Sequence, residues 1–113
     1  MTTAQVDAMI ASMKIPYAYH QFADGTGQQP PFVCFFYDNN ADFLADDINY
    51  KKIVRLYIEL YTDEKDFSLE SVVESTLNDN GIVYTSEEDY IDTERLHVTV
   101  YSSDICLEVS NNG

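Results

Sequence analysis

The most regular pattern in the chain is an alternation of apolar and other side chains from Ile53 to Tyr61. Successive side chains of a β-strand point to opposite faces of its sheet, so this pattern predicts a strand with one face in the core. The expected core positions are Val54, Leu56, Ile58 and Leu60. The second face carries Tyr57 and Tyr61 with two charged residues, and we expect it to be partly exposed or to meet another subunit.

Two aromatic segments precede this strand. Tyr17–Phe22 has the length of a short strand, and Phe32–Tyr37 is apolar on both faces, which is typical of a central strand. Asp24–Pro31 is rich in glycine, glutamine and proline and predicts a loop between them. Asp38–Asn49 is a second polar segment, before the alternating strand.

A later alternation predicts another strand over Leu96–Tyr101. The side expected to face the core carries Leu96, Val98 and Val100. The opposite side carries His97, Thr99 and Tyr101. Ahead of this strand, Ile82–Thr85 predicts a short strand and Ser86–Asp92 an acidic connection.

The N-terminal segment repeats apolar residues with helical spacing. Thr2 and Gln5 have the spacing of a capping box, which predicts that the helix begins just after Thr2. Pro16 ends the helix near Lys14, because the residue before a proline disfavours helical backbone. The apolar stripe consists of Val6, Met9, Ile10 and Met13.

A second helix is expected over Phe67–Asn78, with Asp66 as its N-cap and Gly81 as its stop. Glu70 lies in the first turn, where a carboxylate suits the helix dipole. The inward stripe consists of Leu69, Val72, Val73, Thr76 and Leu77.

The element order is therefore α-β-β-β-α-β-β, without a repeat or a domain break. This order predicts an α+β two-layer sandwich, in which two helices pack on a mainly antiparallel sheet. The apolar sides of Val54–Leu60 and Leu96–Val100 would pack against the second helix. We expect one domain over residues 1–103, with residues 104–113 frayed or adding a short edge strand.

Composition and charge narrow the function classes. The 113 residues include 20 acidic and 6 basic side chains, which gives a net charge of −14. Binding to nucleic acid through phosphates, or to an anionic membrane, requires a basic surface that this chain lacks. No apolar run has the length of a membrane span or the form of a secretory signal, so we expect a soluble protein made in the cytoplasm.

Residues with catalytic chemistry stand in no recognisable arrangement. His20 and His97 belong to no motif, and Cys34 lies in an apolar run where the reactive thiolate is disfavoured. Gly25–Gly27 lacks the basic residue and helix start of a phosphate-binding loop. Cys34 and Cys106 are expected as small, half-buried thiols, and no feature of the sequence requires a bond between them. We predict a protein that is not an enzyme and needs no cofactor.

Metal-ligand spacing is likewise incomplete. The chain has no CxxC and no paired histidines, which zinc sites typically use. Asp38, Asn40 and Asp42 match the first ligand positions of a calcium loop, but Phe43 stands where that loop needs glycine. Acidic runs such as Glu87–Asp89 are expected to be solvated, so we predict no metal site from the sequence.

Aromatic residues are the other unusual feature, with nine tyrosines and six phenylalanines. Tyrosine suits interfaces because it combines an apolar body with a polar tip. Two interpretations remain open, namely ordinary core filling and self-association. The candidate interface residues are Phe43, Leu44, Tyr57, Tyr61 and Tyr101.

Six segments together resemble the tail-completion or tail-terminator family of long-tailed phages and prophages. The segment Val54–Asp66, which reads VRLYIELYTDEKD, carries most of the resemblance. The others are Ile15–Phe22, Pro31–Tyr37, Asp42–Asp46, Gly81–Tyr84 and Tyr90–Tyr101. The resemblance is one of order and pattern over Ile15–Tyr101, and no single motif is diagnostic.

The resemblance implies an α+β subunit that forms a hexameric ring, caps the finished tail tube and joins it to the head. Its partners would be further copies of itself, the tail tube protein and the head–tail connector protein. The expected location is the tail or neck of the virion, after a soluble stage in the bacterial cytoplasm. The family has no catalytic motif to transfer, and the loops Ala23–Pro31 and Asp38–Asn49 are candidates for ring or tube contacts.

Two alternatives remain beside this interpretation. One is another neck or minor capsid component. The other is an acidic binding module that mimics nucleic acid and inhibits a DNA-binding protein. The high acidity favours such a mimic, although the charges form no regular phosphate-like stripe along the sequence.

Overall fold

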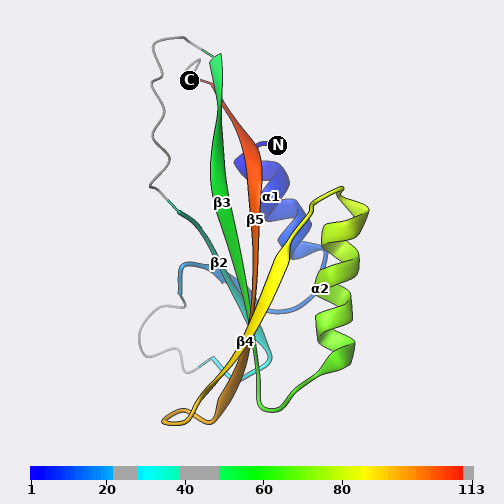
Figure 1. Ribbon diagram of the computed structural model, residues 1–113, viewed down its shortest axis with the longest axis vertical. Helices are drawn as coiled ribbons and strands as arrows, with labels where there is room; N and C mark the ends of the chain where they lie inside the picture. Colours follow the sequence, from blue (N-terminus) through cyan, green and yellow to red (C-terminus); the bar gives the residue numbers. More distant parts are fainter. Residues whose placement is uncertain (22–27, 39–48, 111–113) are drawn as a thin grey trace.

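The computed structural model describes residues 1–21, 28–38 and 49–110. In this part of the chain, two helices lie on one side of a five-stranded sheet (Figure 1). The elements are α1 (Thr3–Ala11), β1 (Tyr17–Tyr19), β2 (Phe32–Asp38), β3 (Asn49–Thr62), α2 (Phe67–Asp79), β4 (Thr85–Ile91) and β5 (Leu96–Ser110). The strand order is β1-β2-β3-β5-β4, and all neighbours are antiparallel except β1 and β2. The predicted α+β class and element order are confirmed.

The long pair of β3 and β5 forms the middle of the sheet. Their register runs from Asn49 opposite Ser110 to Thr62 opposite His97. Residues 104–110 therefore continue β5. The prediction that this segment is frayed or adds a separate edge strand is wrong. Ile105 and Leu107 join the buried core, which is why this segment stays paired.

The register decides which side of β5 faces the helices. Leu60 lies opposite Thr99, and Ile58 lies opposite Tyr101. Cross-strand partners share a face, so Thr99 and Tyr101 point to the helix side. The aliphatic residues Leu96, Val98 and Val100 point to the other side. The facing predicted for this strand was thus wrong. The sequence pattern was ambiguous because the opposite set of β5 positions ends in Ile105 and Leu107, which are also apolar.

One hydrophobic core lies between the sheet and the two helices. The sheet contributes aliphatic and aromatic side chains from β2, β3 and β5, and the alternation of β3 is confirmed. Burying each large aliphatic side chain contributes about 1.5–3 kcal/mol. The core residues that are at most 2% exposed are Val6, Ile10, Val33, Phe35, Leu56, Ile58, Leu60, Val73, Leu77 and Tyr101.

Both helices begin where the sequence predicts. Thr2 and Gln5 form the reciprocal capping box, and Asp66 accepts a hydrogen bond from the Leu69 N–H at 3.0 Å. The first helix ends at Ala11 in the structure, earlier than the predicted Lys14. Gly81 follows α2 with φ +71°, a conformation that disfavours residues with a side chain.

The position of β4 differs from the sequence-based prediction. Residues 82–84 are not a strand, and Ser86–Asp92, predicted as a connection, forms most of β4 and pairs with β5. This strand lies at the edge of the sheet and is exposed at every position except the half-buried Ile91. With both faces in water it needs no apolar alternation, and its carboxylates discourage pairing with another edge.

No helix in the described ranges is both long enough and apolar enough to cross a bilayer.

Leu56→Asp should prevent folding, because it places an unpaired charge at a position that is 1% exposed. The loss of the leucine alone costs about 2–5 kcal/mol, a large part of a typical total of about 5–15 kcal/mol. Ile53→Asp is the matched control on the same strand, since Ile53 is 61% exposed. Circular dichroism and urea unfolding should show a folded control and an unfolded Leu56→Asp chain. A cooperatively folded Leu56→Asp protein would contradict the assigned facing of β3.

Candidate functional site

Aromatic rings form a row on the side of the sheet that faces away from both helices, which we call the far face. Phe32 of β2 stacks on Tyr61 of β3, with ring centroids 4.8 Å apart. Phe36 stacks on Tyr57 at 5.0 Å, and His20 stacks on Phe36 at 5.3 Å. The row therefore joins the end of β1 to the middle of β3, through cross-strand pairs that stabilise the sheet.

One charged side chain lies between the two tyrosines of the far face. Glu59 lies between the two tyrosines of β3 and accepts a hydrogen bond from the Tyr61 hydroxyl at 3.0 Å. Burial, followed by the charge of Glu59, raises the pKa of Tyr61 above its usual value. On β5 the same face continues with Val98 and Val100, of which Val98 is 6% exposed. Among the described residues, the result is a partly shielded aromatic and aliphatic surface with one carboxylate between the rings. Glu87 and Asp89 of β4, opposite Val100 and Val98, border it.

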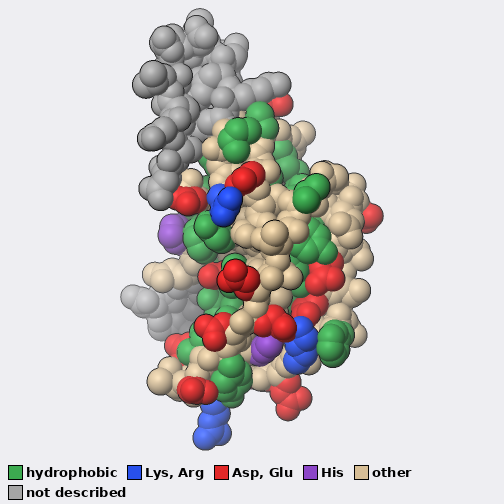
Figure 2. Space-filling view, in the orientation of Figure 1, with side chains coloured by type: hydrophobic (Ala, Val, Ile, Leu, Met, Phe, Trp, Pro, Cys, Tyr) green, Lys and Arg blue, Asp and Glu red, His purple; other side chains and the backbone are tan. Residues whose placement is uncertain are grey.

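A charged pair lies further along the same face. Arg55 Nε lies 2.9 Å from Asp104 Oδ1, and this hydrogen bond lowers the pKa of Asp104. Both side chains are at least half exposed, so the pair contributes little to stability. Figure 2 shows how acidic side chains outnumber basic ones over the view that it presents.

The structure separates the candidate interface residues. Tyr57 and Tyr61 lie half-buried on the far face. Tyr101 is wrongly grouped with them, because it is 1% exposed on the helix side and its hydroxyl donates to Glu74 Oε2 at 2.9 Å. Phe43 and Leu44 lie outside the described residues.

Both cysteines are free and lie on the far face. Cys34 pairs with Glu59 and Cys106 pairs with Ile53, so six positions of β3 separate them. That separation is about 20 Å along a strand, too far for a disulfide within the chain. Burial, with a further contribution from Glu59, raises the pKa of the Cys34 thiol to about 11.

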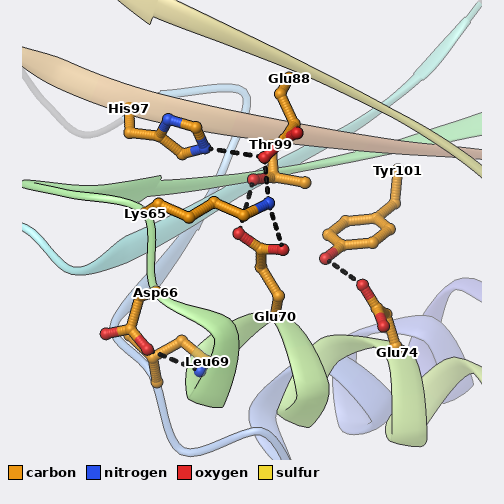
Figure 3. A network of polar contacts seen from close by, with 9 residues as sticks. All are labelled: Lys65, Asp66, Leu69, Glu70, Glu74, Glu88, His97, Thr99 and Tyr101. Carbon is orange, nitrogen blue, oxygen red and sulfur yellow. Dashed lines mark hydrogen bonds and ion pairs between the residues drawn. The ribbon is translucent and has the colours of Figure 1, made fainter.

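A polar network connects the start of α2 to β4 and β5 on the helix side (Figure 3). Lys65 Nζ donates to Glu70 Oε1 at 2.9 Å and also to Glu88. The Thr99 hydroxyl lies 3.4 Å from Glu70 Oε2, and His97 Nε2 lies 3.3 Å from Glu88 Oε1. Two carboxylates thus share one ammonium, beside an imidazole.

The two carboxylates differ in exposure. Glu70 is 7% exposed, and Glu88 has a side chain that is 48% exposed. The hydrogen bond from Lys65 lowers the pKa of Glu88, and bonding to the two glutamates raises the pKa of Lys65. The buried Glu70 requires this cation, because an unpaired charge is costly inside a protein.

Sequence reasoning missed this network. Glu70 does lie in the first turn of α2, as predicted, but the orientation of its side chain toward the sheet was not predicted. A signal was available, since Glu70, Val73 and Leu77 have the i, i+3, i+7 spacing of one helix face. Glu88 and His97 carried no such signal, because only the pairing of β4 with β5 brings them near α2.

Comparison with protein-family models and with curated proteins found no match. The expectations of no catalysis and no cofactor remain predictions. Two features with a defined chemistry stand out, namely the aromatic far face and the polar network.

Tyr101→Phe should lower the free energy of unfolding by about 1 kcal/mol, because Glu74 loses a hydrogen-bond donor. Tyr90→Phe is the control, because Tyr90 is 50% exposed and its change should stay within about 0.5 kcal/mol. Urea unfolding of both variants measures the difference. Equal effects would contradict the interior position of the Tyr101 hydroxyl.

Only one thiol per folded chain should react readily with Ellman's reagent at pH 8. Cys106 is exposed, whereas the raised pKa and burial of Cys34 leave little of the reactive thiolate. Cys106→Ser should therefore abolish the fast reaction, and denaturant should restore a reacting thiol. Rapid labelling of folded Cys106→Ser would show that Cys34 is accessible.

Proposed function

We propose that this chain is a virion structural protein, a tail terminator that forms a ring, closes the tail tube and joins it to the head connector. The observation that carries the proposal is the aromatic far face on a chain of net charge −14. The resemblance of Ile15–Tyr101 to the tail-terminator family supports the same conclusion.

The far face has the chemistry of a protein interface. Interface centres are enriched in tyrosine and phenylalanine and depleted in charge. Tyr57 and Tyr61 stack on phenylalanines of β2, so their rings are held in place before a partner arrives. Prior ordering reduces the entropy lost on association.

The net negative charge of each chain opposes the assembly of free chains into a ring. Fourteen excess negative charges per chain repel further copies, and ionic strength weakens this repulsion beyond about 8 Å. We therefore expect free chains to associate weakly and the end of a tube to act as the template. An acidic ring also suits a DNA conduit, because it repels phosphates and lets the polymer slide.

Ring closure requires two different surfaces on each subunit, since a face that meets only its own copy gives a closed dimer. In this proposal the far face supplies one of those surfaces. A neck or minor capsid component would use the same face, and a nucleic-acid mimic would instead use the acidic surface.

Light scattering of the protein alone and mixed with tail tubes that lack a terminator tests the proposal. A hexamer, or a monomer that joins tube ends and halts their growth, is the expected result. A monomer that leaves the tubes unchanged would overturn it. Binding to a host DNA-binding protein in that case would favour the inhibitor.

Tyr57→Asp should abolish ring formation and tube capping, because it places a charge among the stacked rings. Val83→Asp is the matched control, since Val83 is 87% exposed and belongs to no strand of the sheet. Thermal unfolding should establish that both variants are folded. A folded Tyr57→Asp protein that caps tubes like the parent chain would remove the far face from the interface.

A further inference from the structure

Three side chains of different elements bring metal-binding atoms together within the polar network. Carboxylate oxygens of Glu70 and Glu88 and an imidazole nitrogen of His97 all lie within 4.8 Å of one another (Figure 3). They come from α2, β4 and β5, respectively. No two of them are close enough in sequence to form a recognisable ligand motif, so the arrangement exists only in the folded chain.

His97 presents an unsatisfied nitrogen to this cluster. Its Nε2 atom is shielded from solvent and has no hydrogen-bond partner within the described residues, although Glu88 Oε1 lies 3.3 Å away. A nitrogen lone pair and a carboxylate oxygen repel each other at this distance unless a proton or a cation lies between them. His97 Nε2 is thus aimed at a position beside Glu88 where a proton or a metal ion would remove this repulsion.

The Lys65 ammonium already places a positive charge between the two glutamates. It contacts the Oε1 atoms of both Glu70 and Glu88. Its side chain is 35% exposed and its long stem is flexible, so the ammonium is free to move into water. A metal ion that replaced it would meet the same two oxygens and the imidazole nitrogen.

We propose that Glu70, Glu88 and His97 form a binding site for a divalent transition-metal ion such as Zn²⁺, with Lys65 as its built-in competitor. Zinc takes imidazole and carboxylate ligands at about 2.0–2.2 Å. Reaching those distances requires a small contraction, and the half-exposed Glu88 is free to make it. Mg²⁺ and Ca²⁺ prefer all-oxygen sites, so the nitrogen ligand selects against them.

The ion would tie the start of α2 to the β4–β5 hairpin. Thr99 lies beside the site and contacts Glu70 Oε2, which orients that carboxylate. Binding that requires three separate elements to be folded together stabilises the folded state. This inference goes beyond the proposed function, and its test uses no tail components.

Zn²⁺ titration of the full chain, stripped of metal with a chelator, tests the site by calorimetry and thermal unfolding. We expect saturation at one ion per chain and a rise in melting temperature, with no comparable effect of Mg²⁺. The chain has two histidines, so their ring signals in NMR spectra are readily assigned. Zn²⁺ should shift the His97 signals and leave those of His20 in place, a result that needs no variant.

Matched variants separate a specific site from surface binding. His97→Gln should weaken zinc binding by about tenfold or more, whereas His20→Gln should leave it unchanged. Lys65→Gln should destabilise the metal-free protein and yet tighten zinc binding, because the competing ammonium is gone. Equal binding by both histidine variants would identify an adventitious ion only and overturn the proposal. A Lys65→Gln chain that is destabilised without tighter zinc binding would also overturn it, leaving a purely structural network.

Discussion

The register between β3 and β5 is the constraint on which the rest of the structure depends. Side chains alternate along a strand, so a shift of one residue would exchange the two faces of β5. With Ile58 opposite Tyr101, the tyrosine enters the core and its hydroxyl reaches Glu74. A shifted register would expose Ile105 and move His97 away from α2. The core and the polar network therefore rest on the same pairing.

Each face of the sheet has a different chemical character because of this pairing. The helix side combines an aliphatic core with two glutamates of α2 that reach polar positions on β5, at Thr99 and Tyr101. The far side keeps its aromatic rings in cross-strand stacks and leaves Glu59 among them. A helix that covers polar and apolar parts of one strand must itself carry both kinds of side chain, as α2 does.

The proposed association surface and the proposed metal site consequently lie on different faces of the sheet. The far face and the group of Glu70, Glu88 and His97 lie on opposite sides of β5, so each can be substituted without replacing a residue of the other. The acidic character of the chain would affect the two proposed properties in opposite ways. Negative charge opposes contact between copies, and it favours the arrival of a cation.

Local signals in the sequence determined where the two helices begin and how β3 faces. The capping box of Thr2 and Gln5, the cap at Asp66 and the glycine after α2 act within a few residues, so they can be read without the fold. Only the tertiary structure decided the facing of β5, the existence of β4 and the meeting of Glu70, Glu88 and His97. Both sides of β5 carry apolar residues, and an edge strand exposed on both faces needs no periodic pattern. Contacts between segments far apart in the chain leave no local trace, because they arise only when strands pair and a helix packs across them.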